Sequence, residues 1–196
     1  MVEAISPAPH LTSANLAGAN LKDANLANAV LALANLERAK GQGAVLNDAD
    51  LSEANLSEAD FSQAAFNRAK AAAVEAPLAN LAGMAARGST WSGSNLQGAN
   101  LDGATLSEAG LSQANLTGAT LTNSQLYRAN LIGAQLGGVD FTGANLQEAL
   151  IRDANLANAN LTNADLRGAN LVRTDLSVAR LCQTRLASGE ISDRDC

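Results

Sequence analysis

Residues 156–176 read LANANLTNADLRGANLVRTDL, and leucine returns at every fifth position of this stretch. The same spacing runs through most of the chain. From position 11 to position 191, steps of five meet leucine at 27 of 37 positions, which we call the central positions. Phenylalanine, isoleucine or tryptophan fills six of the other ten. A large apolar residue at so many regularly spaced positions identifies an internal repeat of five residues.

Neither an α-helix nor a flat strand can bury all of these central residues. On a helix, five residues advance by about 500°, so successive leucines would spiral around every side. On a flat strand, an odd spacing places them on opposite faces. A chain that bends once per repeat resolves the conflict, because each leucine then shares an inward face with the residue two places before it. That residue is alanine in 27 of 36 repeats.

If each bend is near a right angle, four repeats close one coil of about 20 residues. The pattern therefore predicts an all-β solenoid of about eight to nine coils, stacked at roughly 4.8 Å. The position before each central residue is asparagine in 14 repeats and aspartate in five. Such side chains hydrogen-bond to nearby backbone and tolerate corner conformations, so the bends explain these columns without any ligand.

Repeats such as ANLAG, ANLKD, ADLSE, ANLDG and ADLRG resemble the pentapeptide-repeat family, whose pattern is A-(N/D)-L-x-x. The resemblance covers residues 9–191 apart from one interruption. It implies the family's right-handed quadrilateral β-helix. The handedness and the square section rest on this resemblance, since the spacing alone indicates only inward leucines and a bend in every repeat.

The interruption is the segment 67–90, NRAKAAAVEAPLANLAGMAARGST, which holds three of the four central positions with a small residue. A coil lined by alanine would leave voids, which destabilise a protein. Pro77 can start a helix and Gly88 can end one. We therefore expect a short helix over about 76–87 that leaves the wall or lies against it. The alternative is a continuous but distorted coil. Gly41, the fourth small central residue, is expected to mark a smaller bulge.

These patterns divide the chain into five parts. They are an N-terminal extension (1–8), a first solenoid segment (9–66), the interruption (67–90), a second solenoid segment (91–191) and a C-terminal tail (192–196).

Composition and charge narrow the possible functions. The net charge of −6 argues against direct binding to nucleic acid, which needs a basic patch. No apolar run is long enough to span a membrane, and the N-terminus lacks the features of a signal peptide. Two cysteines, Cys182 and Cys196, do not make a disulfide framework, and the thiol of Cys182 is expected to point outward and be incidental. We expect a soluble, cytoplasmic protein.

The sequence offers no catalytic constellation. Its single histidine, His10, has no cysteine or second histidine with which to bind a metal, and no nucleophile to activate. The glycine pairs lack the strand–loop–helix setting of a phosphate-binding loop. We therefore expect no enzyme, no metal and no cofactor.

Outward residues repeat with the period of a coil and suggest a docking face. Ile132, Leu150 and Val172 flank central positions that are 20 residues apart, so they are predicted to lie on one side in successive coils. If the interruption preserves whole coils, Val30 and Leu33 join this side. A contiguous apolar strip on a polar rod suggests a docking surface. Scattered surface aliphatics are also common, which is the plainer explanation.

The densest acidic run is a second candidate site. It consists of Asp48, Asp50, Glu53, Glu58 and Asp60. If these carboxylates are spread around the square section of the solenoid, their main role would be to keep the outer surface of one coil hydrated. A specific role as a negative patch is the alternative.

Two further contact sites depend on the irregular parts of the chain. An insertion that projects from the rod would carry contacts of its own, through Leu78, Leu81 and Met84. The tail ASGEISDRDC is short and polar, so the last coil is expected to be poorly covered. Since open strand edges invite association, we expect a possible end-to-end homodimer through Leu181, Leu186 and Ile191.

These features favour a non-enzymatic rigid scaffold that presents a side and an inserted loop to a protein partner of unknown identity. The family resemblance implies one alternative, because a branch of the family mimics duplex DNA and binds type II topoisomerases, including gyrase. This chain has the rod, an interruption and a negative charge. Beyond residue 140, however, arginines and aspartates nearly balance, whereas DNA mimicry needs a sustained negative stripe. The scaffold is therefore the preferred interpretation.

Overall fold

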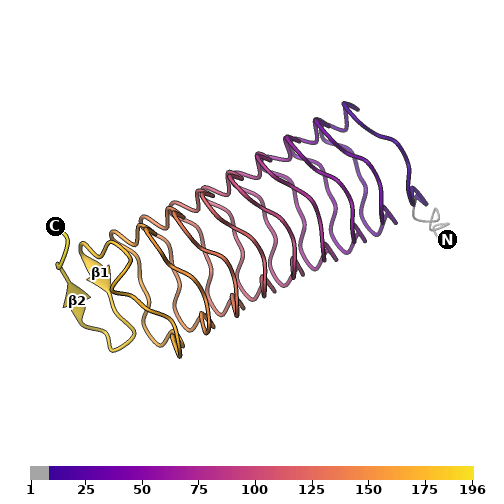
Figure 1. Ribbon diagram of the computed structural model, residues 1–196. Coiled ribbons are helices and arrows are strands. Elements are labelled where there is room, and N and C mark those ends of the chain that lie inside the picture. Colours follow the sequence, from indigo (N-terminus) through magenta and orange to yellow (C-terminus); the bar gives the residue numbers. More distant parts are fainter. Residues whose placement is uncertain (1–8) are drawn as a thin grey trace, which may run out of the picture.

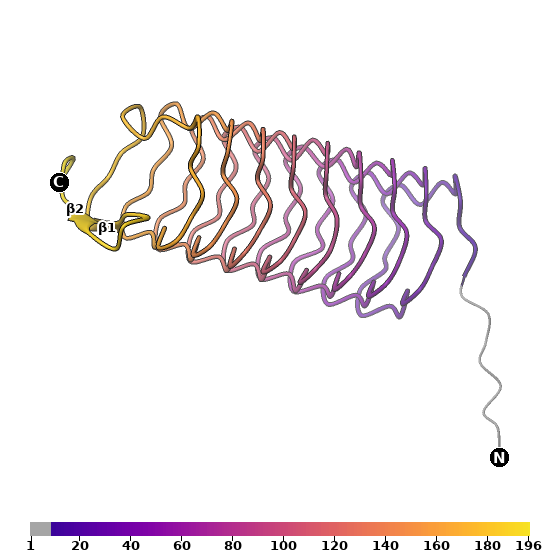
Figure 2. The ribbon, with the colours of Figure 1, turned by 90° about the horizontal axis from the view of Figure 1, so that it is seen from below.

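The computed structural model describes residues 9–196, and the predicted N-terminal extension lies outside the described residues. The described chain winds as one long solenoid (Figures 1 and 2). Isolated parallel β-bridges join residues 20 positions apart, as His10 pairs with Val30 and Val30 with Asp50. One coil thus takes four repeats, as the period of five predicts.

Each bend is a four-residue turn that begins at a central residue. The N–H of Ala14 donates to the carbonyl oxygen of Leu11 at 3.0 Å, and this bond recurs along the chain. The third residue of the turn has a positive φ, 56° at Ser13, which is typical of a type II turn. The side-chain oxygen of Asn15 accepts a hydrogen bond from the N–H of Ala17 at 3.2 Å. The predicted role of asparagine beside the bends is confirmed.

The interior is a continuous apolar stack. Every central residue from Leu31 to Leu166 is buried, together with the residue two places before it. The central residues of the first coil, Leu11, Leu16 and Leu21, are only partly buried. They lie at the end of the described stack, where a second coil covers them on one side only.

The segment 67–90 continues this stack without a break. Residues 9–196 contain no helix, so the helix predicted over 76–87 is wrong and the alternative of a continuous coil is correct. Lys70 pairs with Thr90 and Glu75 with Asn95 through the same parallel bridges as elsewhere. The backbone therefore keeps its period where the sequence pattern weakens.

An exchange of volume between adjacent inward positions keeps this coil packed. Val74 and Met84 stand where alanine is usual, each two residues before a small central residue, Ala76 or Ala86. All four side chains are buried. A larger residue beside a small one supplies volume that leucine supplies elsewhere, which offsets the voids expected from alanine at the central positions.

Aromatic side chains fill the rest of this region. Phe61, Phe66 and Trp91 are fully buried, and the ring centroids of Phe66 and Trp91 lie 5.7 Å apart in an edge-to-face arrangement. The indole N–H of Trp91 donates to the hydroxyl of Ser89 at 2.8 Å, and that hydroxyl donates to the carbonyl oxygen of Ala86 at 2.6 Å. The polar edge of the tryptophan is therefore satisfied inside the apolar stack.

Gly41 also belongs to the regular wall, and the predicted bulge is wrong. Its N–H donates to the carbonyl oxygen of Asp60 at 2.7 Å, and its own carbonyl accepts from Ala44 at 3.0 Å. A Cβ at Gly41 would lie 2.1 Å from Cε1 of Phe61. Position 41 carries glycine because the phenylalanine of the next coil occupies the space that a side chain would need.

Replacing Gly41 by leucine should therefore destabilise the protein, although leucine is the usual residue at this position. We expect a loss of about 1–3 kcal/mol in the free energy of unfolding, because the added side chain overpacks against Phe61. The double variant Gly41→Leu/Phe61→Leu should recover most of it. Urea unfolding followed by circular dichroism measures both values, and an equal loss in both variants would contradict this packing.

The chain ends in two short antiparallel strands, β1 (Thr184–Arg185) and β2 (Ile191–Ser192). Thr184 pairs with Ser192 and Arg185 with Ile191. The tail thus turns back on the last coil (Figure 2), and this positions the residues at the C-terminal end of the rod.

Candidate functional site

One side of the solenoid carries the predicted docking residues, and we call it the docking side. Its bridges join, in order, Val30, Asp50, Lys70, Thr90, Gly110, Asn130, Leu150 and Asn170. Leu150 lies between Asn130 and Asn170, while Ile132 and Val172 lie two residues beyond these asparagines. Leu150 is 37% exposed, Val172 is 51% exposed and Ile132 is half-buried. The structure therefore brings these three aliphatic residues together on adjacent coils.

Val30 and Leu33 lie on the docking side but far from this group. Four bridged positions, from Asp50 to Gly110, separate Val30 from Asn130, and none of them carries an aliphatic side chain. Leu33 is 54% exposed. The predicted strip is thus two separate groups rather than one continuous surface.

The sequence alone did not single out Arg152, which lies in the group formed by Ile132, Leu150 and Val172. The N–H of Gly133 donates to the carbonyl oxygen of Arg152 at 2.9 Å, and the N–H of Asp153 donates to that of Val172 at 3.1 Å. Arg152 therefore occupies the coil between Ile132 and Val172. The spacing of 20 residues on either side was the signal that could have found it.

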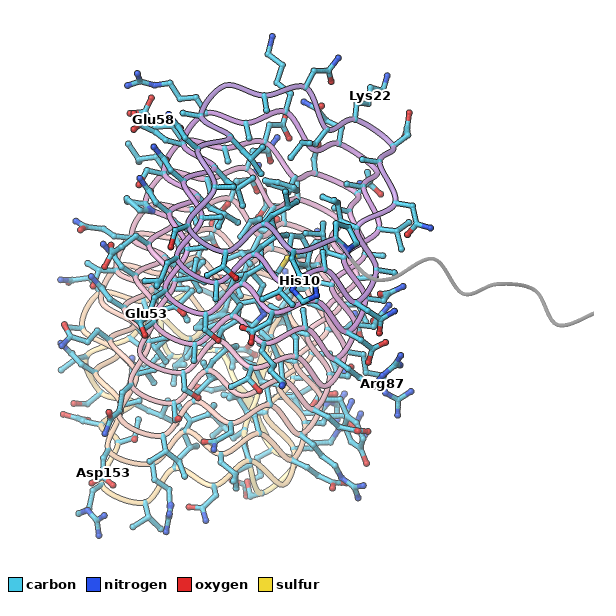
Figure 3. The ribbon with its side chains drawn as sticks, turned by 90° about the vertical axis from the view of Figure 1, so that its right-hand side faces the viewer. His10, Lys22, Glu53, Glu58, Arg87 and Asp153 are labelled. Carbon is cyan, nitrogen blue, oxygen red and sulfur yellow. A yellow bond between two sulfur atoms is a disulfide. The ribbon has the colours of Figure 1, made fainter. Side chains whose placement is uncertain are left out.

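The acidic run does not form one patch. Its five members are spread over four successive repeats, because Asp48, Glu58 and Asp60 each belong to a repeat of their own and Asp50 shares one with Glu53. Charged side chains project outward around the whole rod (Figure 3). No sustained negative stripe results from this arrangement.

Basic side chains of neighbouring coils bind two of these carboxylates. Glu58 accepts two hydrogen bonds from Arg38, at 2.9 and 3.1 Å, and Asp48 accepts 2.8 and 2.5 Å bonds from Arg68. These hydrogen bonds lower the pKa of Glu58 and the pKa of Asp48. Both carboxylates are thus ionised and paired within the protein.

Local hydrogen bonds occupy two others. Asp50 accepts from the hydroxyl of Ser52 at 2.6 Å and from its N–H at 3.0 Å, which lowers the pKa of Asp50. Burial raises the pKa of Asp60, but bonds from the N–H of Ser62 and the amide of Gln42 outweigh it, so this pKa is lowered. These two carboxylates therefore accept hydrogen bonds from groups of the bends and of the adjacent coil.

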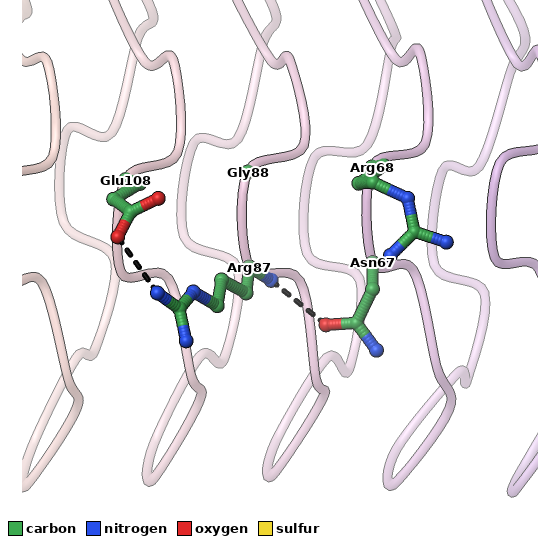
Figure 4. Close-up of a pocket in the computed structure, with 5 residues that line it drawn as sticks. All are labelled: Asn67, Arg68, Arg87, Gly88 and Glu108. Carbon is green, nitrogen blue, oxygen red and sulfur yellow. Dashed lines mark hydrogen bonds and ion pairs between the residues drawn. The ribbon is translucent and has the colours of Figure 1, made fainter.

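A shallow depression on another side is lined by Asn67, Arg68, Arg87, Gly88 and Glu108 (Figure 4). Arg87 donates from its guanidinium to Glu108 at 2.8 Å, and from its backbone N–H to Asn67 at 3.0 Å. Arg68 is held by its ion pair with Asp48. The cations of this depression already have partners.

The contact site predicted on an insertion is wrong for two of its three residues. Leu81 and Met84 are buried in the stack, because they occupy inward positions of a regular coil. Leu78 is 66% exposed and adopts a φ of 58°, which is uncommon for a bulky residue. It lines an open groove with Pro77 and with the glutamine, glycines and threonine that follow in the next two coils.

The C-terminal end is closed rather than poorly covered, so that expectation is wrong. The N–H of Leu181 donates to the carboxylate of Asp195 at 2.8 Å, and the N–H of Asp195 donates back to the carbonyl oxygen of Leu181 at 2.9 Å. Arg194 donates to the carbonyl oxygens of Leu176 and Ala179. The charged tail is thus an end cap that bonds to several backbone groups of the last coil.

A disulfide joins Cys182 to Cys196, so the expected free thiol at Cys182 is wrong. The bond links the last residue to the coil that it covers. Disulfides persist mainly in oxidising compartments, whereas a cytoplasmic location was expected from the sequence. That location stays a prediction.

The C-terminal cap leaves the three residues of the predicted dimer contact exposed to different degrees. Leu181 is 4% exposed, Leu186 is half-buried and Ile191 is 53% exposed. Ile191 therefore offers most of the apolar surface left at this end. Association of two chains through this end stays a prediction.

Groups typical of catalysis are not assembled in the described part of the chain. His10 is exposed at the first described coil. Residues 9–196 contain no group of three or more histidine, cysteine or acidic residues placed to hold a metal ion. In the same range, no helix has the length and apolar character needed to cross a membrane.

Comparisons with known proteins agree with this geometry. The family model for pentapeptide repeats matches with eight copies, over residues 10–40, 42–70, 78–113, 109–147 and 149–186. The gap between the second and third matches falls where the central residues are small. No curated protein matches the chain.

Three solved structures illustrate the similarity. Rfr23, a pentapeptide repeat protein from the cyanobacterium Cyanothece 51142, is 33% identical over 46% of this chain and 61% of its own, with a TM-score of 0.45. This chain therefore spans less than two thirds of Rfr23. HetL from Nostoc sp. strain PCC 7120 is 30% identical over 93% of this chain and 89% of its own, with a TM-score of 0.33. Full-length QnrB1, a plasmid-mediated fluoroquinolone resistance protein, is 21% identical over 81% and 89%, with a TM-score of 0.38.

Members of this family fold as right-handed β-helices, the architecture that the bends and bridges describe here. The family model covers most of the described solenoid. The chain belongs to the pentapeptide repeat family.

Proposed function

We propose that this protein is a non-enzymatic rigid scaffold that binds a partner protein through the docking side, at Ile132, Leu150 and Val172. The observation that carries the proposal is the placement of three aliphatic side chains on adjacent coils, where most outward positions are polar or small. Proteins built from these repeats are generally non-enzymatic, which supports the scaffold role.

The backbone supports this role because it holds the surface in one arrangement. Each coil is bonded to the next through bridges on its sides, and Leu150 is bridged on both faces of its coil. A partner would therefore meet a surface that is already ordered, and binding would cost little conformational entropy.

Replacing Ile132 and Val172 together by aspartate should abolish partner binding without unfolding the rod. We expect affinity for a partner to fall by at least about tenfold, since apolar anchors dominate such interfaces. The measurement compares proteins retained by the immobilised protein and by the variant, followed by titration of each purified partner. The matched control is Thr122→Asp/Thr162→Asp, equivalent outward positions on another side. Equal retention by all three proteins would contradict the proposal.

Binding to a type II topoisomerase by DNA mimicry is the second candidate. The acidic composition favours it, and the pairing of Asp48 and Glu58 with arginines speaks against it. QnrB1 is a fluoroquinolone resistance protein, but its similarity to this chain extends only to the fold.

Gyrase-catalysed DNA supercoiling, titrated with this protein in the presence and absence of a fluoroquinolone, separates the two candidates. We expect neither inhibition nor protection from the drug, because no side of the rod carries a continuous negative stripe. Inhibition at micromolar protein would instead favour the DNA mimic. The carboxylates at 48–60 would then be the first residues to replace.

A further inference from the structure

Arg152 lies at the centre of the apolar group on the docking side. Its carbonyl oxygen accepts from Gly133 in the coil of Ile132, and the N–H of the next residue, Asp153, donates to Val172 in the coil on the other face. Leu150 precedes it by two residues and is 37% exposed. Arg152 thus occupies the coil between Ile132 and Val172 and follows Leu150 by two residues.

This guanidinium differs from most others in the protein because it has no carboxylate partner among residues 9–196. Seven of the ten arginines form an ion pair within 4 Å. The nearest candidate in sequence, Asp153, is bonded to Arg173, with one bond of 2.6 Å. The Nε atom of Arg152 is shielded from solvent and has no acceptor in the described structure. A buried donor without an acceptor is costly, so a rotamer change that brings this atom to an incoming acceptor would be favourable.

The backbone beside Arg152 also lacks an acceptor that its neighbours have. The side-chain oxygen of Asn130 accepts from the N–H of Ile132 at 3.1 Å, and that of Asn170 accepts from the N–H of Val172 at 3.2 Å. In the coil between them, leucine replaces asparagine at position 150. The N–H of Arg152 therefore has no acceptor within residues 9–196. Arg152 thus lacks the side-chain acceptor that both neighbouring coils supply at this position.

We propose that Arg152 anchors the partner by binding a carboxylate, and that the partner segment carries aliphatic side chains next to this aspartate or glutamate. The proposal rests on the docking function proposed above and names the chemistry of its partner. A carboxylate matches both the charge and the open donors of Arg152, and charge-assisted hydrogen bonds are stronger than neutral ones. The surrounding aliphatic residues would exclude water and strengthen this contact.

The direct test uses the intact protein labelled with ¹⁵N at arginine, in which the Nε–H signal of Arg152 is assigned from its loss in Arg152→Lys. The probe is the peptide acetyl-Leu-Asp-Leu-amide. We expect a saturable shift of this signal with a dissociation constant of about 1 mM, and binding at least tenfold weaker for acetyl-Leu-Asn-Leu-amide and acetyl-Gly-Asp-Gly-amide. An unmoved signal at about 10 mM peptide, or equal shifts for all three peptides, would overturn the proposal.

Partner retention separates this inference from the docking function. Arg152→Gln should lose the partners that Ile132→Asp/Val172→Asp loses, whereas Arg180→Gln, which changes another arginine without an ion pair, should keep them. Retention by Arg152→Gln together with loss in the aspartate variant would reject the carboxylate anchor and leave the docking side intact. Retention by both would reject the docking side itself.

Discussion

Replacing Trp91 by alanine is expected to lower the free energy of unfolding by about 3–5 kcal/mol, more than any other single substitution proposed for this protein. The side chain is fully buried, packs edge-to-face against Phe66 and donates to Ser89. The neighbouring central residues Ala71 and Ala86 are too small to fill the cavity that alanine would leave. Urea unfolding followed by circular dichroism measures the loss, because the variant lacks the protein's single tryptophan and cannot be followed by tryptophan fluorescence.

Trp91→Phe is the matched control. It keeps an aromatic ring beside Phe66 and removes the hydrogen bond to Ser89, so its loss should be clearly smaller than that of alanine. A loss below about 1 kcal/mol for the alanine variant would show that this coil collapses around the change. The aromatic cluster would then not support the wall between residues 67 and 90.

Breaking the disulfide is expected to give the second largest effect. Replacing Cys182 and Cys196 by serine should destabilise the end cap by about 3 kcal/mol, because the closed loop of about 15 residues regains its freedom in the unfolded state. The loss should be local, since each coil of a solenoid contacts only its neighbours. Hydrogen exchange should therefore accelerate at Leu181 and Asp195, whose N–H groups join the tail to the last coil, and stay unchanged at Leu116.

Reduction of the wild-type protein is the control for this variant. The reduced protein should match the double serine variant in hydrogen exchange at the C-terminal end. Unchanged exchange in both would mean that Asp195, Arg194 and the β1–β2 pair hold the cap without the covalent bond. The disulfide would then contribute little to its stability.

The regular part of the fold follows from the sequence because its determinants are local. The turn that starts at Leu11 closes within four residues, and the oxygen of Asn15 reaches a backbone group only two residues away. Each repeat therefore contains the information for its own bend and its own inward pair. Repetition then forces the coils to stack, since no repeat can bury its leucine alone.

The docking side was predictable in part for the same reason. Once a coil takes 20 residues, spacing alone places Ile132, Leu150 and Val172 on adjacent coils. Spacing also places Arg152 among them, but an arginine at a surface position looks ordinary in sequence. Only the structure shows that Asp153 is engaged by Arg173 and that the Nε atom of Arg152 is left without an acceptor.

The sequence by itself thus determined the solenoid, its inward residues and its bends, because each depends on contacts within one repeat. The tertiary structure decided how the irregular parts resolve. Val74, Met84 and Trp91 compensate for small central residues elsewhere, and the tail folds back to join Cys196 to Cys182. These outcomes depend on volumes and contacts between different repeats. The spacing predicts the orientation of each residue separately, whereas packing depends on the residues that the fold brings into contact.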